Sequence, residues 1–179
     1  MNDPHGVIQF QGKFHLFYQH NPFSGKCGTM HWGYAISNDL IHWEHQPEAL
    51  APSEHYDDWE AGGIFTGSAI EHQDELILFY TGCMKDRQAQ CMASSSDGLI
   101  FSKSEQNPVL AKPPPEINPQ DFRDPKVWKQ GDMWYMVTGV STLKKQLCDC
   151  RGWAVQKSSQ GLPAPFHEPQ ELGICQLPC

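Results

Sequence analysis

The sequence of 179 residues predicts an all-β fold. Short segments rich in aromatic and β-branched residues recur along the chain, and each is followed by a tight turn and a second segment of the same kind. Gly, Asn or Asp occupies these turns, as β-hairpins require. No helical periodicity of 3.6 residues extends over a comparable length. Successive hairpins with long connections fit a β-propeller or a β-sandwich, and the pattern alone does not separate the two.

Each predicted hairpin joins two strand candidates through a short polar turn. In chain order, the paired candidates are residues 7–10 with 14–18, 31–36 with 40–43, 64–70 with 76–80, 91–93 with 100–101, and 125–128 with 133–137. Residues 113–115 are three prolines and are assigned to a loop, because proline donates no hydrogen bond to a ladder.

The strand pattern fades beyond about residue 144, where 152–155 is the only later strand candidate. We therefore divide the chain into a β-rich part, residues 1–145, and an irregular tail, residues 146–179. A change of reading frame after about Lys145 is one hypothesis for the loss of pattern. It would make the chain a fragmentary gene product.

The net charge of the chain limits the kinds of molecule that it is expected to bind. The net charge of −8 disfavours nucleic acid and anionic membranes, which would repel the chain, whereas a neutral sugar is compatible with it. No apolar run approaches the roughly 20 residues that span a bilayer. Asn2 and Asp3 follow Met1 directly, without the features of a secretory signal, so a cytoplasmic location is expected. Secretion remains open if an N-terminal segment is missing.

The cysteines indicate reduced thiols. Their number is seven, no CxxC pair occurs, and Cys148, Cys150, Cys175 and Cys179 crowd the end of the chain. A zinc site built on Cys148 and Cys150 is an alternative, but their spacing does not match the common ribbons and fingers. We expect no metal.

Two motifs place an aspartate before a proline at the edge of a predicted strand. The first is Asn2-Asp3-Pro4-His5-Gly6 and the second is Phe122-Arg123-Asp124-Pro125. Taken alone, the first is compatible with an ordinary Asx turn and the second with a surface Arg–Asp pair. Their shared pattern in one β-rich chain makes both candidates for a functional site.

Three further segments carry side chains suited to sugars. Aromatic faces, amides and hydroxyls recur in residues 17–22, 31–33 and 65–69, and such groups stack on sugar C–H faces and bind sugar hydroxyls. Trp32 and Phe65 stand beside polar, glycine-containing turns, so pocket lining and core packing both remain open for them. Core packing is predicted for four other aromatic residues, Phe10, Phe14, Phe79 and Tyr80.

Taken in chain order, these five segments resemble the sequence blocks of glycoside hydrolase family 32 across about residues 1–140. The resemblance implies a five-bladed β-propeller, incomplete in this chain, with a funnel-shaped site at one end of its axis. It also implies a retaining β-fructofuranosidase that acts on sucrose, sucrose 6-phosphate or fructans. The expected partner is a small sugar, and no metal or organic cofactor is needed.

The same resemblance implies roles for individual residues. Asp3 would be the nucleophile, and Asp124 would stabilise the transition state through the fructose hydroxyls. The sugar-binding residues would be Asn2, Pro4, His5, Gln19, Trp32, Phe65, Thr66 and Arg123.

The chain departs from the family pattern in two places. The family's general acid/base is a glutamate in a Glu-Cys motif, but residues 173–179 contain no glutamate, and neither Glu168 nor Glu171 carries the motif. Cys27-Gly28 stands where the family often has Trp-Gly. Two alternatives therefore accompany the enzyme: an inactive sugar-binding remnant, and a related five-bladed glycosidase acting on arabinose or xylose chains. The two acid-Pro motifs disfavour the latter.

Overall fold

The computed structural model describes residues 1–26, 28–142 and 151–158. Within these ranges the chain is built from β-strands, with one 3₁₀ turn at Trp59–Ala61, so the all-β prediction is confirmed. The described residues include no helix long and apolar enough to cross a membrane.

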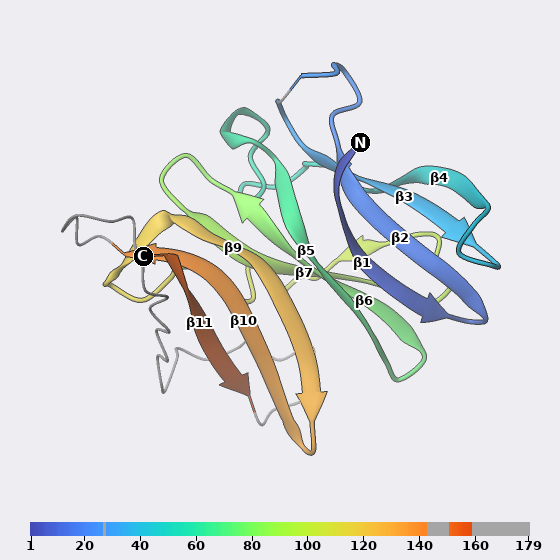
Figure 1. The fold of residues 1–179 in the computed structure, drawn as a ribbon. Coiled ribbons are helices and arrows are strands. Elements are labelled where there is room, and N and C mark those ends of the chain that lie inside the picture. Colours follow the sequence, from blue (N-terminus) through green and yellow to red (C-terminus); the bar gives the residue numbers. More distant parts are fainter. Residues whose placement is uncertain (27, 143–150, 159–179) are drawn as a thin grey trace.

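The strands form three antiparallel sheets in which consecutive strands are neighbours (Figure 1). The first sheet contains β1 (Asn2–Phe10), β2 (Lys13–His20), β3 (His31–Ser37) and β4 (Trp43–Leu50). The second contains β5 (Ile64–His72), β6 (Glu75–Cys83), β7 (Gln88–Ser95) and β8 (Ser102–Lys103). The third contains β9 (Ile117–Gln130), β10 (Met133–Thr142) and β11 (Arg151–Ser158).

The first strand of each sheet is its inner strand. β5 lies between β1 and β9 and contacts both, so the three sheets fan outward from a shared line of inner strands (Figure 1). This is the arrangement of neighbouring blades in a propeller.

Each junction between sheets has its own apolar core. One cluster, between the first and second sheets, includes Phe17, Trp32 and Tyr80. Another, between the second and third sheets, includes Phe79 and Trp134. Side chains of β6 alternate between the two clusters because successive residues of a strand point to opposite faces. The second sheet is therefore buried on both faces.

Two predicted strand positions are wrong for the same physical reason. Residues 40–43 were expected to form a strand, but β4 begins only at Trp43, because the carboxylate of Asp39 accepts hydrogen bonds from the backbone N–H groups of Ile41 (2.9 Å) and His42 (2.7 Å). Residues 100–101 likewise precede β8, where Asp97 accepts from the N–H groups two and three residues later. These Asx turns satisfy backbone donors locally and delay the strand.

Three of the four aromatic residues predicted for the core are buried. Phe10, Phe79 and Tyr80 are buried as predicted, whereas Phe14 is only partly buried. Residues 113–115 lie outside the strands. The late strand candidate 152–155 lies in β11, which pairs along β10 and extends the third sheet. Of the predicted tail, residues 146–150 and 159–179 lie outside the described residues, and so do Cys148, Cys150, Glu168, Glu171, the segment 173–179 and, earlier in the chain, Cys27.

Each inner strand contains a β-bulge, in which it has one residue more than the partner strand opposite. In β1 the extra residue is Asp3, and in β5 it is Thr66. In β9, Asp124 and Pro125 together face the single residue Thr138. Bulges redirect side chains away from the regular alternation of a strand. The three sheets therefore interrupt their inner strands at corresponding places.

Replacing Gly67 by alanine is expected to disrupt the bulge of β5. A Cβ at this position would lie 1.9 Å from the backbone oxygen of Phe79, and a backbone atom in the buried β6 cannot move aside. We expect Gly67→Ala to lower the free energy of unfolding by about 3 kcal/mol or more, measured by urea denaturation. Gly25→Ala is the control, because a Cβ there meets no atom within 4 Å. An equal, small effect of both variants would contradict this account.

Candidate active site

A pocket of about 440 Å³ lies where the three inner strands carry their bulges. Its lining residues come from the first, second and third sheets and from the connection between β2 and β3: Asn2, Asp3, Gln19, Met30, Phe65, Thr66, Arg123 and Asp124. The structure thus brings both predicted aspartates into one pocket, although 121 positions, from 3 to 124, separate them in the sequence. Of the predicted site residues, only Pro4, His5 and Trp32 do not line it.

Both aspartates have a left-handed backbone conformation. The φ angle is 45° at Asp3 and 62° at Asp124. Residues other than glycine seldom adopt this conformation, and a following proline ordinarily favours extended backbone. Such conformations persist only where surrounding contacts enforce them, and they concentrate at functional sites. Because both aspartates have this unusual backbone conformation and both lie in a bulge, the bulge sets the direction of each carboxylate.

Buried side chains of the second sheet hold the bulge of Asp124. The backbone N–H of Asp124 donates to Oγ1 of Thr81 (3.0 Å), and this hydroxyl donates to Oε1 of Gln90 (3.0 Å). Nε2 of Gln90 in turn donates to the backbone oxygen of Phe122 (2.7 Å). The bonds connect β6 and β7 with the bulge in β9 and with the strand just before it. They satisfy backbone groups that a regular ladder would have paired.

An equivalent contact joins the first sheet to the second. Nε2 of the buried Gln19 donates to the backbone oxygen of Ile64 (3.1 Å), two residues before Thr66. Phe122 stands at the same distance before Asp124. Gln19 therefore lines the pocket and also positions the inner strand of the next sheet.

His5 and Trp32 lie beneath the pocket and support its walls. Nδ1–H of His5 donates to the backbone oxygen of Asp3 (2.7 Å), which leaves Nε2 of this buried imidazole without a partner among the described residues. The rings of His5 and Trp32 meet edge to face at 4.2 Å. Nε1 of Trp32, which is fully buried, donates to the backbone oxygen of Phe65 (3.0 Å). Both side chains thus fix backbone that carries lining residues.

The two carboxylates differ in their surroundings. Asp124 reaches solvent through the pocket, yet the protein around it removes much of its hydration, and this desolvation raises its pKa. The positive charge of Arg123 opposes the shift, and the negative charge of Asp3 adds to it. Arg123 also forms an ion pair with Asp121, in which Nη1 of Arg123 lies 2.9 Å from Oδ1 of Asp121. The positive charge of Arg123 is therefore divided between Asp121 and Asp124. Asp3 receives a side-chain hydrogen bond from Nδ2 of Asn2 (3.1 Å).

Sequence reasoning missed several residues that shape the site. Met30 lines the pocket, and Thr81, Gln88 and Gln90 hold β9. A signal for the glutamines was present, because residues 88 and 90 are polar, directly precede the strand candidate 91–93 and lie two apart, so they would share one face of a longer strand. Nothing in the sequence around Met30 distinguishes it from a core methionine.

Comparison with known proteins agrees with this arrangement. The family model "Glycosyl hydrolases family 32 N-terminal domain" matches residues 1–150. The chain belongs to this family. Sucrose-6-phosphate hydrolase of Escherichia coli is 45% identical over 149 residues, which cover 78% of this chain and 30% of that protein. Raffinose invertase of Escherichia coli is 47% identical over 149 residues, with the same coverage of both chains.

Solved structures show the same family fold. A GH32 β-fructofuranosidase of Bombyx mori superimposes with a TM-score of 0.77 at 41% identity, over 89% of this chain and 33% of that one. A mutant of that enzyme has been solved in complex with sucrose, and it matches with a TM-score of 0.77 at 40% identity over the same shares. The chain thus spans about 30% of the length of the curated relatives and about a third of these structures.

His5 is expected to make the family 32 chain less stable in acid. Burial lowers the pKa of His5 from 6.5 to about 4, although the hydrogen bond to Asp3 partly opposes the shift. Between these values the unfolded chain binds a proton at this position and the folded chain does not, so the free energy of unfolding falls as the pH falls. From about pH 7.5 to about pH 5, the loss due to His5 should be about 2 kcal/mol.

Urea denaturation of the parent and of His5→Asn at both pH values measures this contribution. The asparagine amide retains a donor near the position of Nδ1 but does not titrate. The parent should therefore lose more stability than the variant between the two pH values. Equal losses would show that His5 does not resist protonation in the folded state.

Proposed function

We propose that this chain provides the fructose-binding part of a β-fructofuranosidase that cleaves terminal β-fructofuranosides by a retaining mechanism. The observation that carries the proposal is the convergence of Asp3 and Asp124, from different sheets, in one pocket lined by amide, hydroxyl and aromatic groups. The sucrose complex of the Bombyx mori enzyme and the names of the curated relatives support a sucrose-type substrate. We propose the five-bladed propeller of the family as the architecture that these three sheets belong to.

Asp3 is the nucleophile in this proposal. Its carboxylate attacks the anomeric carbon of the fructosyl unit and forms a covalent fructosyl–enzyme, while the bond to the leaving oxygen breaks. Water then hydrolyses the ester and regenerates the carboxylate. An acid must protonate the leaving oxygen and later accept a proton from water. Asp3 and Asp124 are the carboxylates among the described lining residues, and neither takes this role, so the acid/base remains unassigned.

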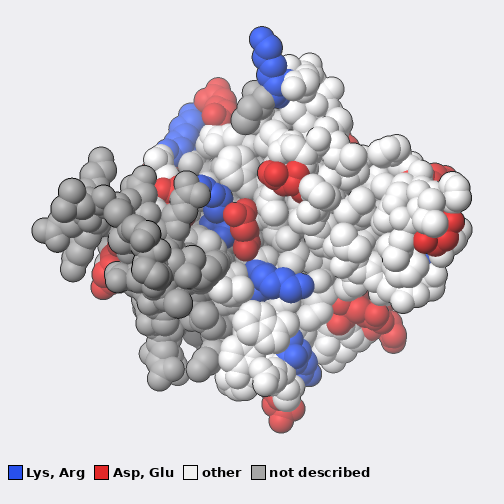
Figure 2. Space-filling model, in the orientation of Figure 1, with Lys and Arg blue, Asp and Glu red and all other residues white. Residues whose placement is uncertain are grey.

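The other lining residues bind the sugar. Asp124 accepts hydrogen bonds from fructose hydroxyls, with Arg123 beside it, and Asn2, Gln19 and Thr66 offer amide and hydroxyl partners. Phe65 presents an aromatic ring to a sugar C–H face. Figure 2 shows uncharged side chains over much of the face in view, with Lys, Arg, Asp and Glu in small separate groups, which is compatible with a neutral sugar.

A second candidate function is sugar binding without hydrolysis. The observation that favours it is that Asp3 and Asp124 are the carboxylates among the described lining residues, and neither takes the acid/base role. The two functions differ in turnover: both bind fructose, but only the enzyme releases glucose from sucrose. Assays of release and of binding on the same preparation therefore distinguish them.

Replacing the nucleophile is expected to abolish hydrolysis. Asp3→Asn removes the negative charge and the attacking oxygen, so glucose release from sucrose should fall by about 10³-fold or more. Coupled glucose oxidation measures the rate. Asp132→Asn is the matched control, because Asp132 is an exposed aspartate at the turn between β9 and β10 and should leave the rate unchanged. Release by Asp3→Asn at the parent rate would refute the nucleophile assignment.

Fructose binding is expected to weaken in acid. Because its pKa is raised, Asp124 becomes protonated at a higher pH than an ordinary aspartate, and the acceptor for fructose hydroxyls is then lost. The dissociation constant should rise as the pH falls from about 7 towards 4. Isothermal titration calorimetry of Asp124→Asn should show weaker binding at neutral pH and a flatter pH dependence. An unchanged pH dependence in this variant would exclude Asp124 as the titrating group.

A further inference from the structure

One hydroxyl group in the second sheet touches two of the three bulges. It belongs to Thr81, a completely buried residue of β6. Oγ1 of Thr81 accepts from the backbone N–H of Asp124 (3.0 Å) in β9, and it lies 3.4 Å from the backbone oxygen of Thr66 in β5. Thr66 and Asp124 both line the pocket of the candidate active site. A single side chain therefore links the backbone of two lining residues that belong to different sheets.

The side-chain amide of Gln90 fixes the direction in which this hydroxyl donates. The backbone oxygen of Phe122 can only accept, so the amide atom 2.7 Å away from it must be Nε2. Oε1 of Gln90 then faces Thr81 and accepts from its hydroxyl (3.0 Å). Because the proton of Thr81 is used in this bond, the lone pairs of Oγ1 remain for the N–H of Asp124. The three bonds thus have one consistent arrangement of protons.

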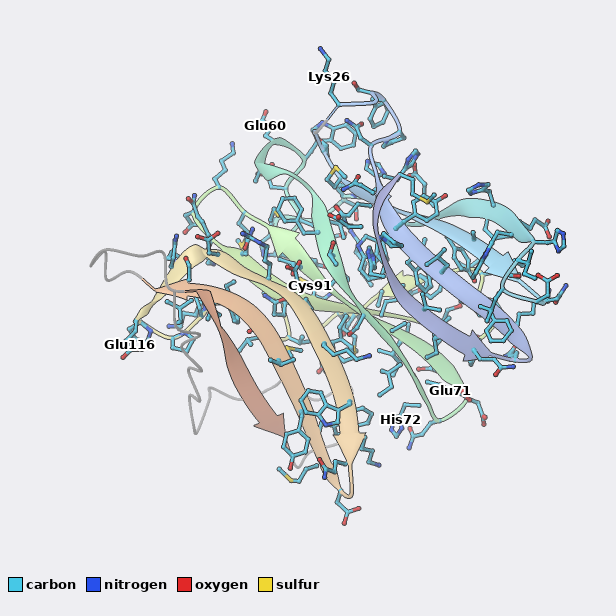
Figure 3. The ribbon with its side chains drawn as sticks, in the orientation of Figure 1. Lys26, Glu60, Glu71, His72, Cys91 and Glu116 are labelled. Atoms are coloured by element: carbon cyan, nitrogen blue, oxygen red, sulfur yellow. The ribbon has the colours of Figure 1, made fainter. Side chains whose placement is uncertain are left out.

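Gln90 is itself held in place by its backbone. Its N–H donates to the backbone oxygen of Leu110 (2.9 Å), and the N–H of Leu110 donates to the backbone oxygen of Gln90 (3.1 Å). Gln90, Thr81 and Phe122 are all completely buried. In Figure 3, Cys91, the next residue of β7, lies in the interior between the first and third sheets. Loss of one partner in this chain of bonds would therefore leave a buried group unpaired.

We propose that Thr81, oriented by Gln90, is a positioning residue for fructose, which holds Asp124 and Thr66 at the spacing that lets both reach one fructosyl unit. The inference rests on the proposed function, because that function assigns fructose to this pocket. Neither Thr81 nor Gln90 lines the pocket, so both act through the backbone of residues that do. The side chain of Asp124 is exposed, and its place depends on how its backbone is held. Binding groups must be held to within about 0.5 Å of their productive positions.

A second hydroxyl of the same sheet provides a comparison. Oγ of Ser68, in β5, accepts from the backbone N–H of Val127 (3.2 Å), three residues after Asp124 in β9. This bond also joins the second and third sheets, but neither Ser68 nor Val127 lines the pocket. If such bonds served only to stabilise the fold, removing either hydroxyl would affect fructose binding in the same way.

Calorimetry with fructose on Thr81→Val and Thr81→Ser tests the proposal. Valine lacks the hydroxyl, so the dissociation constant should rise about tenfold. Serine keeps the hydroxyl and should keep the parent affinity to within about twofold. Ser68→Ala is the control, and it should lower the midpoint of urea denaturation but bind fructose as the parent does. Gln90→Met removes both amide bonds and should act like Thr81→Val, so it serves as the second variant if valine prevents folding.

Amide hydrogen exchange on the same variants shows whether the effect is local. In Thr81→Val, the N–H of Asp124 should exchange faster relative to the N–H of Val127. In Ser68→Ala, the N–H of Val127 should be the one that exchanges faster. Equal acceleration of both amides in Thr81→Val would indicate a general loss of stability and would overturn the positioning role.

Fructose binding by the parent separates this inference from the proposed function. If the parent binds fructose and Thr81→Val binds it equally well, the positioning role is wrong and the proposed function stands. The same conclusion follows if Thr81→Ser loses as much affinity as Thr81→Val, because the hydroxyl would then not be the acting group. If the parent binds no fructose, the proposed function fails and the inference fails with it.

Discussion

The structure depends on side chains of one sheet satisfying the backbone of the next sheet's inner strand. A bulge removes regular ladder partners, and an unpaired backbone group away from water is unfavourable by about 1–3 kcal/mol. Gln19 meets this need in β5 and Gln90 meets it in β9, each at the carbonyl two residues before the bulge. Both bonds also join neighbouring sheets. The hydrogen bonds that satisfy backbone beside the bulges therefore also hold neighbouring sheets together.

The bulges in turn decide where the carboxylates lie. In a regular strand, the residue after Asn2 would point to one face of its sheet, within the apolar layer or away from it. The left-handed conformation at Asp3 and Asp124 instead directs both side chains to the edge where the inner strands meet. His5 below Asp3 and Thr81 below Asp124 hold the two conformations by hydrogen bonds to the backbone. The two halves of the site thus use different residues for the same purpose.

Local features of the fold could be predicted from the sequence, because turn chemistry and alternation act over a few residues. The hairpins around residues 11–12 and 73–74 are examples, and the Asp-Pro motifs identified both aspartates. Asp39 shows the limit: its carboxylate binds the N–H groups of the following residues, so apolar residues that look like a strand lie exposed in a turn. Trp32 shows a second limit of sequence-based prediction, because its position beneath the pocket depends on the packing of two sheets. The contacts of Trp32 with the neighbouring sheet leave no pattern in the local sequence.

The site is therefore a property of packed sheets and not of one motif. Asp3 and Asp124 lie on strands that do not pair with each other, and β5 between them carries Thr66 and accepts the hydrogen bonds of Gln19 and Trp32. A change in β5 alters the relation between the two carboxylates even when neither aspartate is touched. The motifs supply the chemistry, but the second sheet sets the geometry at which this chemistry operates. For this reason the apolar layers on both faces of β6 are as much a part of the site as the residues that line it.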